Sequence, residues 1–482
     1  ACIVFRLTGF QGRFLTMTEK NYPRGFVLGG NPSSRPAGFV ESTLLPGLFV
    51  DPLNEIRSAY DAHSKNAVIV IGTCRSLNGD PSDVAPRLLR ELSASSSKGF
   101  LNALDALVGR FVVIYREGGV LRVVTDATAM RPVFFSECGG AIASHAKLLA
   151  DSEGKADTLP FASSFPANFT PYKGIRILLP NFVLDFETGA LERFWPRQAI
   201  EPRSVEKAAH QVLTLSTRSI SVLARDRISW MAVTAGLDSR VLLAVALNAG
   251  VDFTAFTYGQ NAGTLVDREI AKMLARQFDF THRELPTAKP NKDLREALSN
   301  SHYWDHHWSA VGPLRAAIGN PEAAVFTANI LEIGQSNFRK LDWNAGAEEP
   351  RTAEQMAFVY FRKLSKRAKD QVRNYGHQRY MGEVTAYFQR MIDETGGTTE
   401  FLDPFDEYYW NIRMGTWHGP NTVEKDFYGE PLNPFNSRSI IEPLISVSKL
   451  DQYDLSVFLR LITLVDPRLL ELPINPANLK GL

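Results

Sequence analysis

Short apolar runs separated by turn residues fill the first part of the chain, a pattern typical of strands in antiparallel sheets. Gly118-Gly119 lies between two such runs and Gly139-Gly140 between two more, so both pairs predict hairpins. Helical periodicity is sparser there and covers 84–92 and 100–107. We therefore expect residues 1–200 to form an α+β sandwich of antiparallel sheets with a few helices. The strand runs are 2–7, 67–71, 110–115, 120–125, 133–135 and 141–143.

The pattern changes near residue 200 to an alternation of strand and helix. A helical pattern over 204–223 leads into the apolar run 228–233, and a second apolar helix pattern ends at Gly250. This alternation predicts a doubly wound parallel sheet with added helices, so the expected fold class is α/β. The two expected domains are 1–200 and 201–482. Later strand runs are 252–259 and 282–285, and 324–332 is expected to be the next strand with its exit loop.

The loop after strand 228–233 is the strongest candidate for a functional site. Thr234, Ala235 and Gly236 are small, and Asp238 and Ser239 lie in the first turn of the following helix. Unpaired N–H groups and the helix dipole favour a phosphate at such a place. A Mg²⁺ ion between that phosphate and Asp238 would relieve their repulsion. No lysine follows, which excludes the G-x-x-x-x-G-K-[ST] loop, and an ordinary strand-to-helix turn is the other interpretation.

Composition excludes several classes of partner. The 482 residues carry a formal net charge of +1, which gives no electrostatic reason to expect nucleic acid or an acidic membrane. We find no signal peptide and no apolar run of the roughly 18 residues that a membrane helix needs. The three cysteines, Cys2, Cys74 and Cys138, lack the spacing of a metal site and suit a reducing cytoplasm, the expected location. The charged segment 352–400 is interpreted as solvated helix faces.

Thr-Ala-Gly-Leu-Asp-Ser (234–239) resembles the S-G-G-x-D-S pyrophosphate loop of the N-type ATP pyrophosphatases. It is most similar to that of the asparagine synthetase and β-lactam synthetase family, whose members adenylate a carboxylate with MgATP and then let an amine attack. Thr257-Tyr258-Gly259 stands where that family has S-[IV]-G, and 324–332 where it has S-G-E-G-A-D-E. The resemblance implies ATP and Mg²⁺ as cofactors, with Asp238 and Glu332 holding the metal. The ATP-binding residues that it implies are Val233, Thr234, Ala235, Gly236, Leu237, Asp238, Ser239, Tyr258, Thr327 and Ala328.

Other positions extend the resemblance. Asp267 matches an aspartate that opens the next helix of the family, and a plain helix N-cap is the other interpretation. Arg413-Met414 resembles the family's R-M, and 433–438 replaces its V-P-F-L-D-x-R with Asn436-Ser437 at the aspartate. The family also has a lysine near the C-terminus that offsets charge on the acyl-adenylate. Lys480 is the best-placed candidate and Lys449 the second, so the implied catalytic residues are Lys480, Arg413 and Asp238.

The segment 109–149 resembles the later half of the class II glutamine amidotransferase domain, which has the Ntn fold. The match covers Gly109-Arg110-Phe111, Asp126 to Phe135 and Ala143 to Leu149. That family uses an N-terminal cysteine whose own α-amine acts as the base. Here Ala1 precedes Cys2, and the R-G-P-D and N-G-E stretches of the family are not evident. We therefore expect a domain without glutaminase activity in which Cys2 is a buried structural residue.

The segment 302–308 is rich in histidine and tryptophan, and His302 and His306 have a spacing that zinc sites use. Nothing nearby completes a zinc ligand set, so pocket aromatics are the preferred interpretation. The sequence as a whole predicts an AMP-forming, MgATP-dependent ligase that joins a small-molecule or peptide carboxylate to an amine, as in β-lactam synthetase-like or natural-product tailoring chemistry. Glutamine-dependent amidation and an inactive nucleotide-binding scaffold are the alternatives. Neither nucleic acid nor a membrane is an expected partner, and a homodimer is left open.

Overall fold

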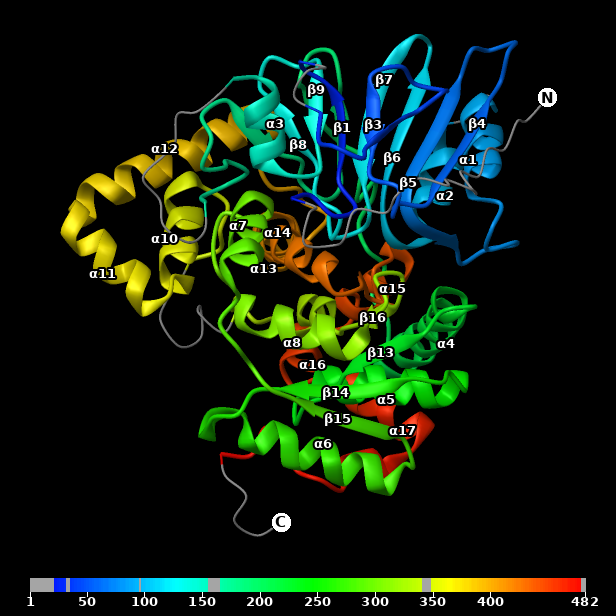
Figure 1. The fold of residues 1–482 in the computed structure, drawn as a ribbon, viewed down its shortest axis with the longest axis vertical. Helices are drawn as coiled ribbons and strands as arrows, with labels where there is room; N and C mark the ends of the chain where they lie inside the picture. Colours follow the sequence, from blue (N-terminus) through cyan, green and yellow to red (C-terminus); the bar gives the residue numbers. More distant parts are fainter. Residues whose placement is uncertain (1–20, 32–34, 95–96, 155–164, 340–347, 478–482) are drawn as a thin grey trace.

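The computed structural model describes residues 21–31, 35–94, 97–154, 165–339 and 348–477. Two antiparallel sheets lie at one end of the molecule and one parallel sheet at the other, with helices between them (Figure 1). The predicted class is therefore confirmed: an α+β part with two antiparallel sheets precedes a doubly wound α/β part. Cys2, the run 2–7 and Lys480 lie outside the described residues. The boundary near residue 200 stays a prediction.

The N-terminal sandwich consists of two six-stranded sheets, ordered β10-β8-β9-β1-β3-β2 and β12-β11-β7-β6-β5-β4. Both predicted hairpins form, since β6 pairs with β7 and β8 pairs with β9. Helices α1 (Val84–Ser93) and α2 (Ser97–Asp105) pack beside the second sheet, and α3 (Ala146–Ser152) packs on the first. The strands are β1 Phe26–Gly29, β2 Val40–Glu41, β3 Leu48–Val50, β4 Ile56–Tyr60, β5 Ala67–Ser76, β6 Leu107–Glu117, β7 Val120–Thr125, β8 Phe134–Ser136, β9 Ala141–Ala143, β10 Ile175–Ile177, β11 Phe182–Asp185 and β12 Leu191–Arg193.

The C-terminal sheet is parallel throughout and has the order β15-β14-β13-β16-β17. Of the strands in this sheet, β13 comes first in the chain and lies in the centre. The chain then adds β14 and β15 on one side before it crosses to the other side for β16 and β17. Ligands of such sheets bind where the winding reverses, which here is between β13 and β16. The strands are β13 Ser229–Ala232, β14 Thr254–Tyr258, β15 Thr281–Leu285, β16 Ala324–Phe326 and β17 Glu430–Leu432.

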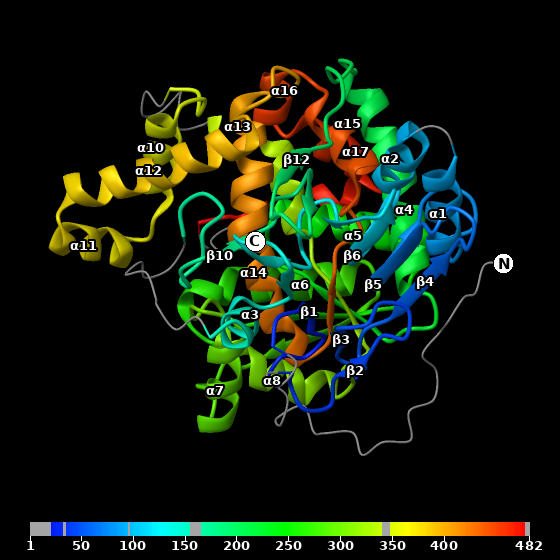
Figure 2. The same cartoon turned by 90° about the horizontal axis from the view of Figure 1, so that it is seen from above.

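Helices cover both faces of this sheet, as a parallel sheet requires. Along β13, Trp230 belongs to the core formed with α7 and α8, whereas Met231 belongs to the larger core that includes α4, α5 and α17. The charged segment expected to be helical forms α10, α11 and α12, which extend to one side of the molecule (Figures 1 and 2). The other helices are α4 Val205–Ala224, α5 Leu237–Ala249, α6 Leu265–Gln277, α7 Lys292–Ser301, α8 Trp308–Ile318, α10 Ala353–Lys363, α11 Lys366–Tyr375, α12 His377–Thr395, α13 Pro404–Tyr408, α14 Gly419–Thr422, α15 Arg438–Ile445, α16 Lys449–Tyr453 and α17 Ser456–Val465.

Short 3₁₀ segments and one π-helix complete the C-terminal part. They are η2 Ala262–Thr264, η3 Asn329–Gln335, the π-helix η4 Tyr409–His418, η5 Val423–Phe427 and η6 Pro467–Leu470. Within the described residues, no helix has both the length and the apolar character needed to cross a membrane.

A turn of the N-terminal sandwich, residues 126–131, joins the two parts. Its backbone amides at Met130 and Arg131 donate to the buried Asp126 carboxylate over 2.9 and 2.8 Å. The same carboxylate accepts a hydrogen bond of 2.8 Å from the Asn436 side chain, and the Trp410 indole donates to the Ala127 carbonyl over 2.7 Å. The turn that resembles a family motif therefore also anchors the C-terminal segments around η4 and β17.

The close approach at this turn gives a test of packing. A Cβ atom at Gly419 would lie 2.3 Å from the Ala129 carbonyl oxygen, whereas one at the exposed helical Gly382 would meet nothing within 4 Å. We expect Gly419→Ala to lower the free energy of unfolding by about 1–3 kcal/mol because backbone must move. Gly382→Ala, the matched control, should raise it by about 0.5–1 kcal/mol. Urea unfolding of both variants checks this, and equal midpoints would contradict the close contact.

Candidate active site

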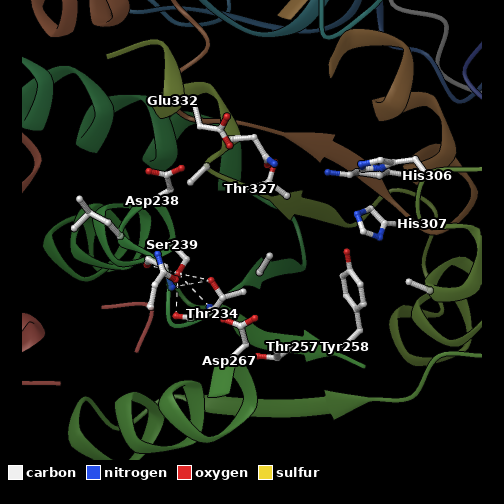
Figure 3. Close-up of a pocket in the computed structure, with 18 of the residues that line it drawn as sticks. Thr234, Asp238, Ser239, Thr257, Tyr258, Asp267, His306, His307, Thr327 and Glu332 are labelled. Carbon is white, nitrogen blue, oxygen red and sulfur yellow. Dashed lines mark hydrogen bonds between the residues drawn. The ribbon is translucent and has the colours of Figure 1, made fainter. Parts of the chain in front are cut away.

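A cavity of about 910 Å³ opens at the carboxyl end of the parallel sheet. Its walls include residues that follow three neighbouring strands: Thr234 after β13, Tyr258 at the end of β14 and Thr327 after β16 (Figure 3). Their position follows from the fold, because the carboxyl ends of parallel strands lie at one edge of the sheet. The predicted residues that line this cavity are Thr234, Gly236, Leu237, Asp238, Ser239, Tyr258, Thr327, Ala328, Glu332 and Arg413.

The loop itself is held by hydrogen bonds to side-chain oxygens. The Thr234 amide donates to Ser239 Oγ over 3.1 Å, and the Gly236 amide donates to Thr234 Oγ1 over 3.1 Å. The Ala235 amide donates to Asp267 Oδ1 over 2.9 Å. These three amides are therefore engaged within the protein, and the small hydroxylated residues act first as a scaffold for the turn.

Three further amides remain available for a ligand. Helix α5 begins at Leu237, and the N–H groups of Leu237, Asp238 and Ser239 make no hydrogen bond with any described residue. They lie at the positive end of a helix dipole, where an anion is stabilised. Of the amides over 234–239 that were expected to bind an anion, only those of Leu237, Asp238 and Ser239 are therefore available. Val233 and Ala235 do not line the cavity; Val233 is buried and its carbonyl accepts from Thr257 Oγ1 over 2.6 Å.

Asp267 has a different role from a plain helix cap. Thr264 is the N-cap residue of α6, and Asp267 lies in the first turn of that helix. Its carboxylate accepts from the Ala235 amide and also lines the cavity. Asp267, which lies on the crossover helix α6, therefore holds the loop 234–239 in place.

Asp238 follows β13 and Glu332 follows β16, the two strands between which the winding of the sheet reverses. Both side chains face the cavity (Figure 3). Burial and the nearby negative charge of Glu332 raise the pKa of Asp238 to about 7, although a 2.5 Å hydrogen bond from the Gln335 amide acts in the other direction. The hydroxyl of Tyr409 donates to Glu332. Two carboxylates that repel each other in a desolvated crevice need a proton or a cation between them. The donor set therefore fits Mg²⁺, which takes one or two carboxylates together with phosphate oxygens.

The raised pKa predicts how metal binding depends on pH. Below about pH 7 Asp238 holds a proton that Mg²⁺ must displace. We expect the association constant for Mg²⁺, measured by calorimetry with a non-hydrolysable ATP analogue present, to rise about tenfold per pH unit up to pH 7 and then to level off. Asp238→Asn should bind weakly without this slope. A flat profile for the unaltered protein would contradict a metal role for Asp238.

The other end of the cavity combines aromatic and aliphatic side chains with the charged residues Glu424 and Lys425. Tyr258 and His307 contact edge to face with ring centroids 5.7 Å apart, and Val311 and Leu314 of α8 also line this end. Between the two ends, the Thr327 hydroxyl is buried and has no hydrogen-bond partner in the part of the chain that the structure describes. An unpaired buried hydroxyl is costly unless a ligand or water pairs with it. The arrangement suits a ligand with a flat apolar group at one end and an anionic group at the other.

Arg413 lies where the resemblance placed it, in the wall of the cavity. It belongs to the π-helix η4, a geometry that often marks functional sites, and its guanidinium lies 3.2 Å from the centre of the Trp417 ring. Burial lowers the pKa of Arg413, while Tyr409 and Glu332 favour its charged form. The cation therefore lies close to Glu332 and can offset charge that develops there.

Two candidates for the catalytic lysine follow from the sequence, Lys449 and Lys480. Lys449 does not line the cavity and instead pairs with the buried carboxylate of Asp406. Lys480 lies outside the described residues. Sequence reasoning missed Lys363 and Lys425, both of which line the cavity, together with Tyr409 and Glu424. The stretch after residue 407 is rich in aromatic residues, a signal that could have indicated Tyr409, but no local pattern indicates Glu424 or Lys425.

The histidine pair with zinc spacing does not converge. His302 Nε2 lies 2.9 Å from Asn421 Oδ1, whereas His306 Nδ1 lies 3.0 Å from Glu424 Oε1. Within the described residues, no group of three or more His, Cys, Asp or Glu residues has the geometry of a metal site. His306 and His307 line the cavity, as the interpretation of this segment as pocket aromatics expects.

No protein-family model and no curated protein matches the sequence. Among solved structures, NMN synthetase from Francisella tularensis aligns with 13% identity and a TM-score of 0.20 over 28% of this chain and 59% of its own, less than two thirds of its length. The allosteric regulatory enzyme of purine biosynthesis aligns with 10% identity and a TM-score of 0.24 over 57% and 77%. Glutamine phosphoribosylpyrophosphate amidotransferase from B. subtilis, in complex with ADP and GMP, aligns with 10% identity and a TM-score of 0.22 over 67% and 73%. Similarities of this size assign no family, so the functional argument rests on the site.

Proposed function

We propose that the chain is an MgATP-dependent ligase that adenylates a substrate carboxylate, releases pyrophosphate and lets an amine attack the acyl-adenylate. The observation that carries this proposal is the pair Asp238 and Glu332 facing the free amides at the start of α5 in one cavity. A carboxylate pair beside an anion-binding helix terminus is an arrangement for a phosphate chain with its divalent cation. The same arrangement motivates ATP and Mg²⁺ as the cofactors.

Each group has a defined task in this scheme. Asp238 and Glu332 would hold Mg²⁺, which neutralises charge on the departing pyrophosphate. The amides of Leu237, Asp238 and Ser239 bind phosphate oxygens, and Tyr409 keeps Glu332 oriented through its hydrogen bond. Adenylation gives the carboxylate a good leaving group, and an amine held in the same cavity then reacts faster because of its proximity.

The proposed amine is not glutamine-derived ammonia. The sequence around Cys2 lacks the amidotransferase groups, so the N-terminal sandwich is proposed to act as a structural partner of the site. A small-molecule or peptide carrying both amine and carboxylate fits a cavity of about 910 Å³ that also accepts a nucleotide, since this volume is near the upper end of common ligand sites. β-Lactam synthetase-like or peptide-tailoring chemistry is the finer proposal.

Two measurements test the proposal. Calorimetry should show binding of ATP that requires Mg²⁺, and exchange of labelled pyrophosphate into ATP should appear with at least one member of a panel of amino acids, N-acyl amino acids and short peptides. Both signals should be strongly reduced in Asp238→Asn and kept in Glu322→Gln, because Glu322 lines a different cavity. Absence of MgATP binding would overturn the proposal in favour of a scaffold. Exchange accompanied by glutamine hydrolysis would favour the glutamine-dependent reaction.

A further inference from the structure

The short segment η5 presents three consecutive charged residues in different directions. Glu424 and Lys425 line the cavity, whereas Asp426 pairs with Arg110 of the N-terminal sandwich. A 3₁₀ helix has about three residues per turn, so neighbouring side chains project about 120° apart. This geometry lets one turn face the cavity and the domain interface at once.

The Lys425 ammonium group is available to a ligand. It makes no hydrogen bond or ion pair with any residue that the structure describes, although the side chain is half-buried in the cavity wall. Its neighbour Glu424 is already occupied, since its carboxylate accepts from the His307 amide over 3.3 Å and lies 3.0 Å from His306 Nδ1. Burial lowers the pKa of Lys425, with Glu424 opposing and Arg110 adding to this change. An anion in the cavity would replace the solvation that the ammonium has lost.

Lys425 is also separate from the carboxylate pair. The charges that act on it are those of Glu424 and Arg110, and it acts in turn on His307 and His418. Asp238 interacts instead with Glu332 and Gln335. The other lysine in the wall, Lys363, lies with its ammonium 4.7 Å from the centre of the Phe338 ring and has further partners. The cavity thus has a cationic subsite distinct from the place proposed for the metal.

Arg110 of the N-terminal sandwich fixes the position of η5. Its guanidinium makes two hydrogen bonds to Asp426, of 2.6 and 2.8 Å, and a third of 2.9 Å to the Met130 carbonyl. Arg110 and Asp426 are both almost fully buried. A bidentate pair fixes orientation as well as distance, so the residue next to Asp426 has a defined position.

We propose that Lys425 binds a carboxylate group of the substrate that MgATP would activate and that Arg110 is a positioning residue that acts through Asp426. The reaction in which this subsite takes part rests on the proposed function, whereas the existence of the subsite does not. It also assigns a task to the N-terminal sandwich that needs no glutaminase chemistry: the sandwich supplies the arginine that orients a wall of the ligase cavity.

Kinetics with the carboxylate that supports pyrophosphate exchange provide the first test. Lys425→Gln should raise the KM for that carboxylate about 10–100-fold, the loss expected for one charge-assisted hydrogen bond, and leave the KM for MgATP unchanged. Lys425→Arg should recover most of the affinity. Arg110→Lys keeps the charge but loses the bidentate fork, so it should also raise the carboxylate KM selectively. Lys147→Gln, a surface lysine paired with Asp151, is the control. An unchanged carboxylate KM in Lys425→Gln would overturn the proposal.

Chemical labelling provides a test that needs no turnover. Pyridoxal 5′-phosphate forms an imine with an unprotonated lysine amine, with loss of water, and borohydride reduces the imine to a stable adduct that peptide mapping locates. Lys425 should be labelled, and glutarate, a simple dicarboxylate, should protect Lys425 without protecting Lys147. In Arg110→Lys the protection should weaken. Lys425 that stays unlabelled, or that glutarate does not protect, would contradict the subsite. Protection without any pyrophosphate exchange would support the subsite and reject the proposed reaction.

Discussion

Replacing Asp238 with Asn should reduce the rate of MgATP-dependent turnover about 10²–10³-fold, the loss typical of removing one preorganised group that stabilises transition-state charge. Asn keeps the shape and the hydrogen bond that Gln335 makes to this position but removes the charge that would hold Mg²⁺. Initial rates of pyrophosphate exchange at saturating Mg²⁺ check this. A rate within about threefold of the original enzyme would reject Asp238 as a metal ligand.

The stability of the same variant separates chemistry from folding. Burial and Glu332 raise the pKa of Asp238 to about 7, so the folded protein binds a proton between roughly pH 4 and 7 that the unfolded chain has released. Stability contributed by this group is therefore greatest at low pH and is lost as pH rises through about 7. Asp238→Asn should match the original protein at about pH 3, below the pKa of the unfolded chain, and be the more stable of the two at pH 8. Urea midpoints at both pH values measure this.

Replacing Arg110 with Met should lower the free energy of unfolding by about 3–5 kcal/mol, because the buried Asp426 carboxylate loses its bidentate partner. Arg24, whose Nε lies 3.7 Å from Asp426, is too distant for a hydrogen bond that would replace the lost pair. Denaturant midpoints and thermal melting of the purified variants give the measurement.

Two variants make this result specific. The double variant Arg110→Met, Asp426→Leu removes both charges and should recover most of the loss, since an apolar pair of similar volume can substitute for a buried ion pair. Arg122→Met breaks the exposed pair with Glu117 and should cost at most about 1 kcal/mol. Equal effects of Arg110→Met and Arg122→Met would show that the interface pair contributes little to stability.

Local sequence was sufficient where the signal is periodic. The hairpins at Gly118-Gly119 and Gly139-Gly140, helix α5 and the central strand β13 all follow from spacing of apolar residues and turn residues within a few positions. The fifth strand, β17, escaped notice because its three residues, Glu430–Leu432, contain a charge and a proline. Glu430 is accommodated there by Arg227 and by Arg24 of the other part, which no local pattern can reveal.

The sequence by itself determined the alternation of strand and helix from α4 to β16, the loop 234–239 and the carboxylates that follow β13 and β16, since each depends on neighbours along the chain. The tertiary structure decided that the Ala235 amide is not free, because Asp267 of α6 accepts a hydrogen bond from it. It also decided that Lys425 rather than Lys449 faces the cavity, because the partner that orients η5 is Arg110, more than 300 residues away. Contacts between residues so distant in sequence form when the two parts pack together, and no periodicity along the chain encodes them.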